Sequence, residues 1–101
     1  MNITKTEENG KITLTLNGWL DTAAAPVLGE EIEKLNAATE IILDFDKVEY
    51  LSSSGLRQVV ATHKKAKELD AVLTVINAHE EIMSIFTLTG LDKKISVTPA
   101  K

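Results

Sequence analysis

The sequence has no cysteine, few aromatic residues and no excess of basic residues. Without cysteine the chain can form no disulfide, thiolate nucleophile or cysteine-ligated metal centre, which permits a reducing compartment and makes the cytoplasm the expected location. Aromatic residues account for only 4% of the chain, so the core must be built from aliphatic side chains. The formal net charge of -4 offers no basic surplus to neutralise phosphates, so we expect no direct contact with nucleic acid.

Long apolar runs are also missing. A membrane-spanning helix needs about 20 consecutive apolar residues, and no run approaches that length, so we expect no membrane insertion. The segment from Met1 to Glu8 is polar and mixed in charge, unlike a signal peptide, and we read the chain as mature protein. With 44% hydrophobic residues, residues 1–101 have the composition of a single domain that folds without disulfides or a metal. We expect a monomer or a weak dimer without a cofactor.

Alternation of apolar and polar residues predicts two strands at the start of the chain, Asn2 to Glu7 and Lys11 to Leu16. Asn9-Gly10 lies between them. Both residues tolerate the positive φ that a type I′ turn requires, so we expect a β-hairpin.

Helices and strands alternate in the rest of the chain. The first helix runs to about Asn36 with Val27, Leu28, Ile32 and Leu35 on one apolar stripe. Pro26 leaves its start open between a cap at Asp21 or Thr22 and a later start near Ala25. The continuous run Ile41-Ile42-Leu43 predicts a central strand, Glu40 to Phe45, that is covered on both faces. A second helix is expected to end near Leu69, and the residues on its apolar side are Leu56, Val59, Val60, His63 and Ala66. The remaining expected elements are a strand from Ala71 to Ile76, a helix from Glu80 to Thr89 capped by Gly90, and a strand from Ile95 to Val97.

This order predicts an α/β domain with a mixed, mostly parallel sheet of four to five strands, an N-terminal hairpin and three main helices.

Three consecutive serines, Ser52, Ser53 and Ser54, lie between the central strand and the second helix and precede Gly55. Loops at the carboxyl ends of parallel strands are where such sheets place functional groups, and a helix that starts there could hold a phosphate on one serine. Serine is also a favoured helix cap, and Ser-Gly clusters mark ordinary turns. The residues alone leave both interpretations open.

Three stretches resemble the STAS domain of bacterial anti-sigma factor antagonists, and the resemblance covers nearly the whole chain. They are Gly18-Trp19-Leu20-Asp21, the segment from Ile42-Leu43-Asp44-Phe45 to Ser53-Ser54-Gly55-Leu56, and Ile85-Phe86-Thr87-Leu88-Thr89-Gly90-Leu91. The resemblance implies a protein that binds an anti-sigma factor serine kinase when unmodified, releases it when phosphorylated, and is restored by a serine phosphatase. Such a protein is a substrate of enzymes and not an enzyme.

Carried over by position, the resemblance implies phosphorylation of Ser53, with Ser54 and Ser52 as less favoured acceptors. It also implies a partner surface made of Asp21, Ser52, Ser53, Ser54, Gly55 and Arg57, with the second helix contributing around Arg57 and His63. The sequence departs from the family pattern at Ser52, where an aspartate is usual. The change removes a carboxylate beside the phosphate and leaves the Ser53 hydroxyl in place.

Other functions have weaker support in the sequence. A STAS-like accessory subunit that docks on a transporter or lipid-trafficking ATPase, without phosphorylation, is the main alternative. A hydrolase triad of Ser53, His63 and Asp21 lacks the glycine-flanked nucleophile motif, and nucleotide binding lacks a glycine-rich loop with lysine. Asp44 and Asp46 have no third ligand for a metal, so we expect no metal site.

Overall fold

The computed structural model describes residues 1–100 and contains one sheet of five strands in the order β1-β2-β3-β4-β5. The strands are β1 (Asn2–Glu8), β2 (Lys11–Leu20), β3 (Glu40–Leu51), β4 (Val72–Ala78) and β5 (Ser96–Pro99). The helices are α1 (Ala25–Glu33), α2 (Ser53–Glu68), α3 (Glu80–Thr89) and the short 3-10 helix η1 (Leu91–Lys93). β1 pairs antiparallel with β2 and all later pairs are parallel, which confirms the predicted mixed, mostly parallel α/β fold.

The chain opens with the predicted hairpin. Glu8 pairs with Lys11 across a two-residue turn, in which Asn9 and Gly10 have φ values of 53° and 84°. Both values are positive, as a type I′ turn requires. At the other end of the chain, Gly90 ends α3 with φ 75° and confirms the predicted left-handed cap.

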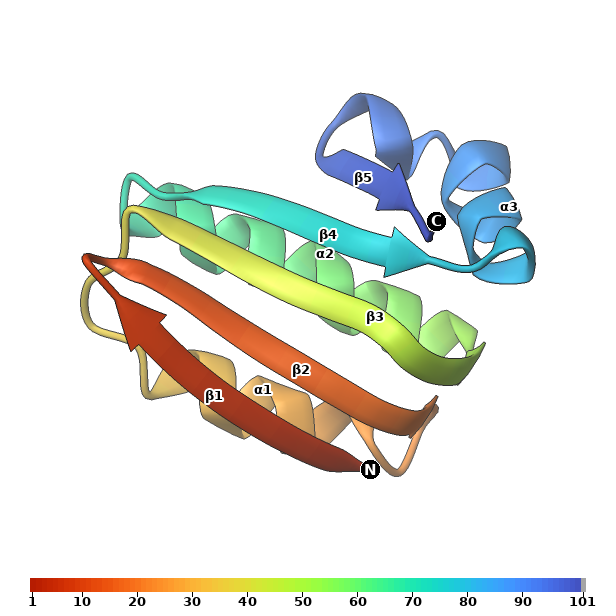
Figure 1. Ribbon diagram of the computed structural model, residues 1–101, viewed down its shortest axis with the longest axis horizontal. Coiled ribbons are helices and arrows are strands. Elements are labelled where there is room, and N and C mark those ends of the chain that lie inside the picture. Colours follow the sequence, from red (N-terminus) through yellow and green to blue (C-terminus); the bar gives the residue numbers. More distant parts are fainter. Residues whose placement is uncertain (101) are drawn as a thin grey trace.

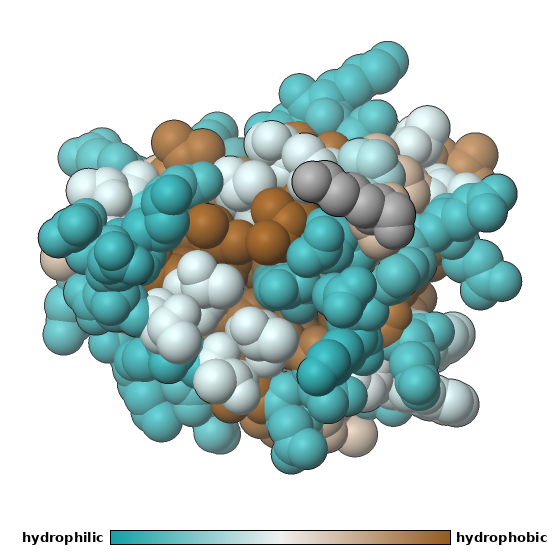
Figure 2. Space-filling model, viewed as in Figure 1, coloured by the Kyte–Doolittle hydropathy of each residue, from teal (hydrophilic) through white to brown (hydrophobic). Residues whose placement is uncertain are grey.

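Helices α1 and α2 cover one face of the sheet and leave Ile42 of β3 half-buried on the other face, so the prediction that β3 is covered on both faces is wrong. Figure 1 shows α1 and α2 behind the sheet. Ile41 and Leu43 point to that side and are fully buried, and Phe45, on the same side, packs against Phe86 of α3 with ring centroids 5.9 Å apart. Ile42 points the other way and is only half-buried. Figure 2 looks onto this open face and shows hydrophobic and intermediate residues in its middle, bordered by hydrophilic side chains.

β3 continues six residues beyond Phe45 because it stays paired with β2 as far as Leu51, and that pairing contains two irregularities. Between the pairs Thr15–Asp44 and Asn17–Lys47, and again between Gly18–Val48 and Trp19–Tyr50, β3 has one residue more than β2. Each extra residue is a β-bulge, which reverses the alternation of side chains. Residues 45, 48 and 51 are therefore buried at intervals of three, and the period of two ends at Phe45.

The apolar stripes of two helices follow the prediction with two exceptions. In α1, Leu28 and Ile32 are buried as predicted, and so is Leu35 just after the helix, whereas Val27 is 43% exposed. In α2, Val59 and Ala66 are buried as predicted and His63 is half-buried, but Thr62, which was not on the predicted stripe, is buried as well. Thr62 can be buried because its hydroxyl donates a 2.8 Å hydrogen bond to the Gln58 carbonyl, which satisfies its polar atom. Across residues 1–100 we find no helix with the length and apolar character needed to span a bilayer.

Candidate functional site

The candidate site lies where β2 and β3 end and α2 begins. Figure 1 shows the two strand ends next to each other at one edge of the sheet. The Leu20 carbonyl of β2 accepts a 3.0 Å hydrogen bond from the Ser52 amide, which ties the start of α2 to the neighbouring strand. Gly55 makes this approach possible, because a Cβ there would overlap the Leu20 carbonyl oxygen and lie 2.9 Å from Leu20 Cγ. The serine loop is therefore rigidly positioned by backbone contacts.

The three serine hydroxyls have different surroundings. Ser52 is the N-cap of α2, since its Oγ accepts a 3.1 Å hydrogen bond from the Gly55 amide. Ser54 Oγ accepts a 3.1 Å hydrogen bond from the Thr22 hydroxyl. Ser53, the first residue of α2, is exposed, and its hydroxyl has no hydrogen-bond partner among residues 1–100. Of the three, Ser53 is the hydroxyl most accessible to a modifying enzyme.

Asp21 lies in the turn that follows β2 and has a structural role there. Its Oδ1 accepts a 3.0 Å hydrogen bond from the Ala24 amide, and its carbonyl accepts one of 2.8 Å from Ala25. Asp21 therefore stabilises the turn before α1. The helix itself starts at Ala25, the later of the two predicted starts and the one that Pro26 favours, and it has no side-chain cap. The next residue, Thr22, contacts Ser54, so the two loops of the predicted partner surface meet.

Arg57 is exposed on α2 and forms no ion pair among the residues that the structure describes. It follows Ser53 by four residues, which places the two side chains one above the other on the same face of the helix. His63 lies farther along α2. Burial, together with the nearby ammonium groups of Lys67 and Lys94, lowers the pKa of its imidazole below the ordinary value of 6.5, so His63 is neutral at neutral pH.

Sequence reasoning assigned no role to an exposed aromatic pair beside the serine loop. Trp19 and Tyr50 are paired residues of β2 and β3, 56% and 48% exposed, with ring centroids 5.3 Å apart. Trp19 Nε1 donates a 3.3 Å hydrogen bond to Glu49. Tyr50 lies beyond Phe45, where the central strand was predicted to end, and it becomes a neighbour of Trp19 because β3 extends to Leu51.

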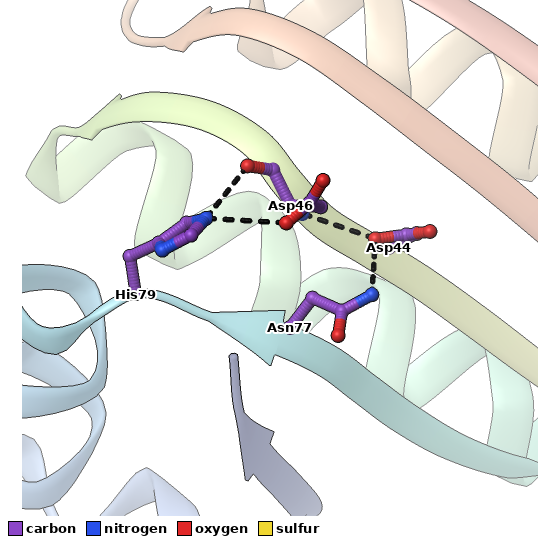
Figure 3. Close-up of polar contacts among 4 residues, drawn as sticks. All are labelled: Asp44, Asp46, Asn77 and His79. Carbon is purple, nitrogen blue, oxygen red and sulfur yellow. Dashed lines mark hydrogen bonds and ion pairs between the residues drawn. The ribbon is translucent and has the colours of Figure 1, made fainter. Parts of the chain in front are cut away.

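A second polar cluster joins β3 to β4 and the start of α3 (Figure 3). Asp44 Oδ1 accepts hydrogen bonds of 3.0 Å from the Asp46 amide and from Asn77 Nδ2. His79 Nε2 lies 2.8 Å from the Asp46 carbonyl oxygen and 3.3 Å from Asp46 Oδ1. The fold brings His79 to Asp46, which lies 33 residues earlier in the chain. These contacts occupy both carboxylates structurally, and no group of three metal-binding side chains occurs within residues 1–100.

Comparisons with known proteins agree with this architecture. The family model described as STAS domain matches residues 2–101. The anti-sigma-B factor antagonist of Bacillus subtilis is 27% identical over 99 residues, which cover 97% of this chain and 91% of that protein. The crystal structure of an anti-sigma factor antagonist from Mycobacterium paratuberculosis superposes with a TM-score of 0.87 at 25% identity, covering 97% of this chain and 85% of that one.

The same fold occurs in the Bacillus cell fate determinant SpoIIAA, whose phosphorylated form superposes with a TM-score of 0.76 at 19% identity, covering 95% of this chain and 90% of that one. A match of the family model over residues 2–101, together with a five-stranded mixed sheet in agreement with solved relatives, shows that the chain belongs to the STAS domain family.

Proposed function

We propose that this protein is an anti-sigma factor antagonist that binds an anti-sigma factor serine kinase while Ser53 is unmodified and releases it once Ser53 is phosphorylated. The observation that carries the proposal is the difference among the three serines. Ser52 and Ser54 use their hydroxyls in hydrogen bonds that hold the loop, whereas the hydroxyl of Ser53 is exposed and has no partner among residues 1–100. The name of the Bacillus subtilis relative supports the same function.

The physical basis of release is the charge that a phosphate adds. Phosphoserine carries roughly 1.5 to 2 negative charges at neutral pH and three strong acceptor oxygens. At Ser53 these oxygens lie at the positive end of the α2 dipole, which stabilises the modified form without refolding. They also lie within one helical turn of Arg57, so the phosphate can pair with the guanidinium. Phosphorylation then both inserts a dianion into the contact surface and removes Arg57 from the partner.

The serine at position 52 is compatible with this function. Aspartate and serine are both good N-caps, because the side-chain oxygen of either accepts a hydrogen bond from the first helical turn. Ser52 forms that bond with the Gly55 amide and places its hydroxyl 3.4 Å from the Leu20 carbonyl oxygen. Serine in place of aspartate at position 52 therefore preserves the loop geometry that presents Ser53. The only group that the partner can no longer contact is the carboxylate of that aspartate.

The proposal is tested by calorimetry, which measures the affinity of the purified protein for an anti-sigma factor serine kinase from the same host. Ser53→Glu should weaken binding about 100-fold, while Ser53→Ala should bind as wild type and resist phosphorylation. Ser96→Glu is the matched control, because it adds the same charge at an exposed serine of β5, away from the site. Equal binding by both glutamate variants would refute control by phosphorylation of Ser53.

A further inference from the structure

We infer that Trp19 and Tyr50, with Val27 beside them, form an aromatic anchor that receives an apolar side chain of the proposed partner. The inference rests on the proposed function, since the partner is the same anti-sigma factor kinase. It adds a contact surface outside the serine loop, on the ends of β2 and β3 and on the first turn of α1. We refer to these three residues as the aromatic anchor.

Most of the large exposed apolar side chains belong to the aromatic anchor. Among residues 1–100, five large hydrophobic side chains are exposed, and three of them make up the aromatic anchor. The other two, Val72 and Leu88, lie at the start of β4 and near the end of α3. Contiguous exposed apolar surface on a small protein marks interaction sites, whereas apolar residues that occur singly need no explanation.

The aromatic anchor is continuous with the serine loop. Tyr50 precedes Ser52 by two residues, and Trp19 precedes Leu20, whose carbonyl accepts the hydrogen bond from the Ser52 amide. A partner large enough to cover Ser53 therefore meets the aromatic anchor in the same contact. The anchor residues come from β2, β3 and α1, so the surface exists only in the folded domain.

Trp19 already contacts Tyr50 and Glu49 in the protein without its partner. The two rings pack against each other with an interplanar angle of 49°, and Trp19 Nε1 donates a 3.3 Å hydrogen bond to Glu49. Contacts that form before binding lower the entropic cost of association. Tryptophan and tyrosine are also the residues most enriched in interface hot spots, because they bury a large area with few rotatable bonds.

The shape of the surface selects the chemistry of the contact. A hollow of about 280 Å³ separates Trp19 from Val27, and its remaining lining is Met1, Ala23, Ala24 and Asp21. All of these except Asp21 are apolar, and Asp21 Oδ1 already accepts a hydrogen bond from the Ala24 amide. The hollow therefore suits an apolar side chain, which would be buried between the indole and the Val27 methyl groups.

The test uses the fact that Trp19 is the only tryptophan in the chain. Protein labelled with 5-fluorotryptophan gives one ¹⁹F resonance, which reports on this position in the presence of an unlabelled kinase. On titration with the kinase, the chemical shift of this resonance should change until the kinase is equimolar and then stay constant. The difference between its chemical shifts in H₂O and D₂O, which reports contact with solvent, should disappear. An unchanged resonance in a complex that calorimetry shows to be saturated would overturn the inference.

Substitutions provide an independent measurement. Trp19→Ala and Tyr50→Ala should each weaken kinase binding at least 10-fold, because both remove anchor surface. Val72→Ala and Leu88→Ala, which truncate exposed apolar side chains elsewhere, should stay within 2-fold of wild type. If Ser53→Glu abolishes binding but the two anchor variants bind as the controls do, the inference is wrong and the proposed function stands. If the wild-type protein binds no kinase, both are wrong.

Discussion

Replacing Gly55 with alanine should destabilise the protein, although alanine is the better helix former. Gly55 is in the first turn of α2, and a Cβ there would overlap the Leu20 carbonyl oxygen and lie 3.0 Å from the Leu20 carbonyl carbon. Because these atoms belong to the backbone of β2, the start of the helix must move. Overpacking of this kind costs about 1 to 3 kcal/mol. Alanine regains at most about 1 kcal/mol of helix propensity, so we expect a net loss of up to about 2 kcal/mol.

Gly29→Ala is the matched control, because Gly29 is also helical and its Cβ would meet only the Gln58 side chain, with Oε1 at 2.9 Å. A flexible amide can turn away, so this variant should be neutral or stabilised by up to about 1 kcal/mol. Urea unfolding monitored by circular dichroism measures both variants. A Gly55→Ala protein at least as stable as Gly29→Ala would refute the close approach of α2 to β2.

Two further changes test the helix cap and the pH dependence. Ser52→Ala should lower the free energy of unfolding by about 1 kcal/mol through loss of the α2 cap, while Ser52→Asp should restore it to within about 0.5 kcal/mol, as urea unfolding will show. Since the pKa of His63 is lowered below 6.5 in the folded state, the unfolded chain binds more protons below that pH, and the free energy of unfolding should fall as the pH drops through and below it. His63→Gln should reduce that fall, and an identical pH profile for the variant would contradict this assignment.

The regular parts of the fold follow from sequence pattern. Alternation predicted the hairpin, and Asn9-Gly10 supplied its turn, because few other residue pairs tolerate two positive φ values. Gly90 predicted the end of α3, because glycine readily adopts the positive φ of a left-handed helix cap. These features depend on local backbone preferences, which a short stretch of sequence contains in full.

The parts that could not be predicted depend on pairing between distant residues. The two bulges in β3 arise in its register with β2, and no residue between Asp44 and Leu51 marks them. Because the bulges could not be predicted, neither the full length of β3 nor the pairing of Trp19 with Tyr50 was predicted. Similarly, Val27 and Leu28 were both placed on the buried stripe of the first helix, and only Leu28 is buried, which leaves Val27 exposed to solvent.

The candidate site was only partly accessible from sequence. The resemblance favoured Ser53 over Ser54 and Ser52 by position, and the hydrogen bonds of Ser52 and Ser54 add a physical reason for that preference. Phosphorylation of Ser53 stays a prediction. Asp21 was a predicted partner contact, and the structure adds its bond to the Ala24 amide. Its contact with a partner stays a prediction, as does that of Arg57.

The central claim is that phosphate on Ser53 controls partner binding. Trypsin releases the peptide from Val48 to Arg57, which contains all three serines, and fragment ions distinguish them by mass spectrometry. We expect protein purified from its host to carry phosphate on Ser53 in an amount that changes with stress, and the phosphorylated fraction to be absent from complexes with the kinase. An unmodified peptide under every condition, or phosphorylated protein bound as tightly as the unmodified form, would contradict the account.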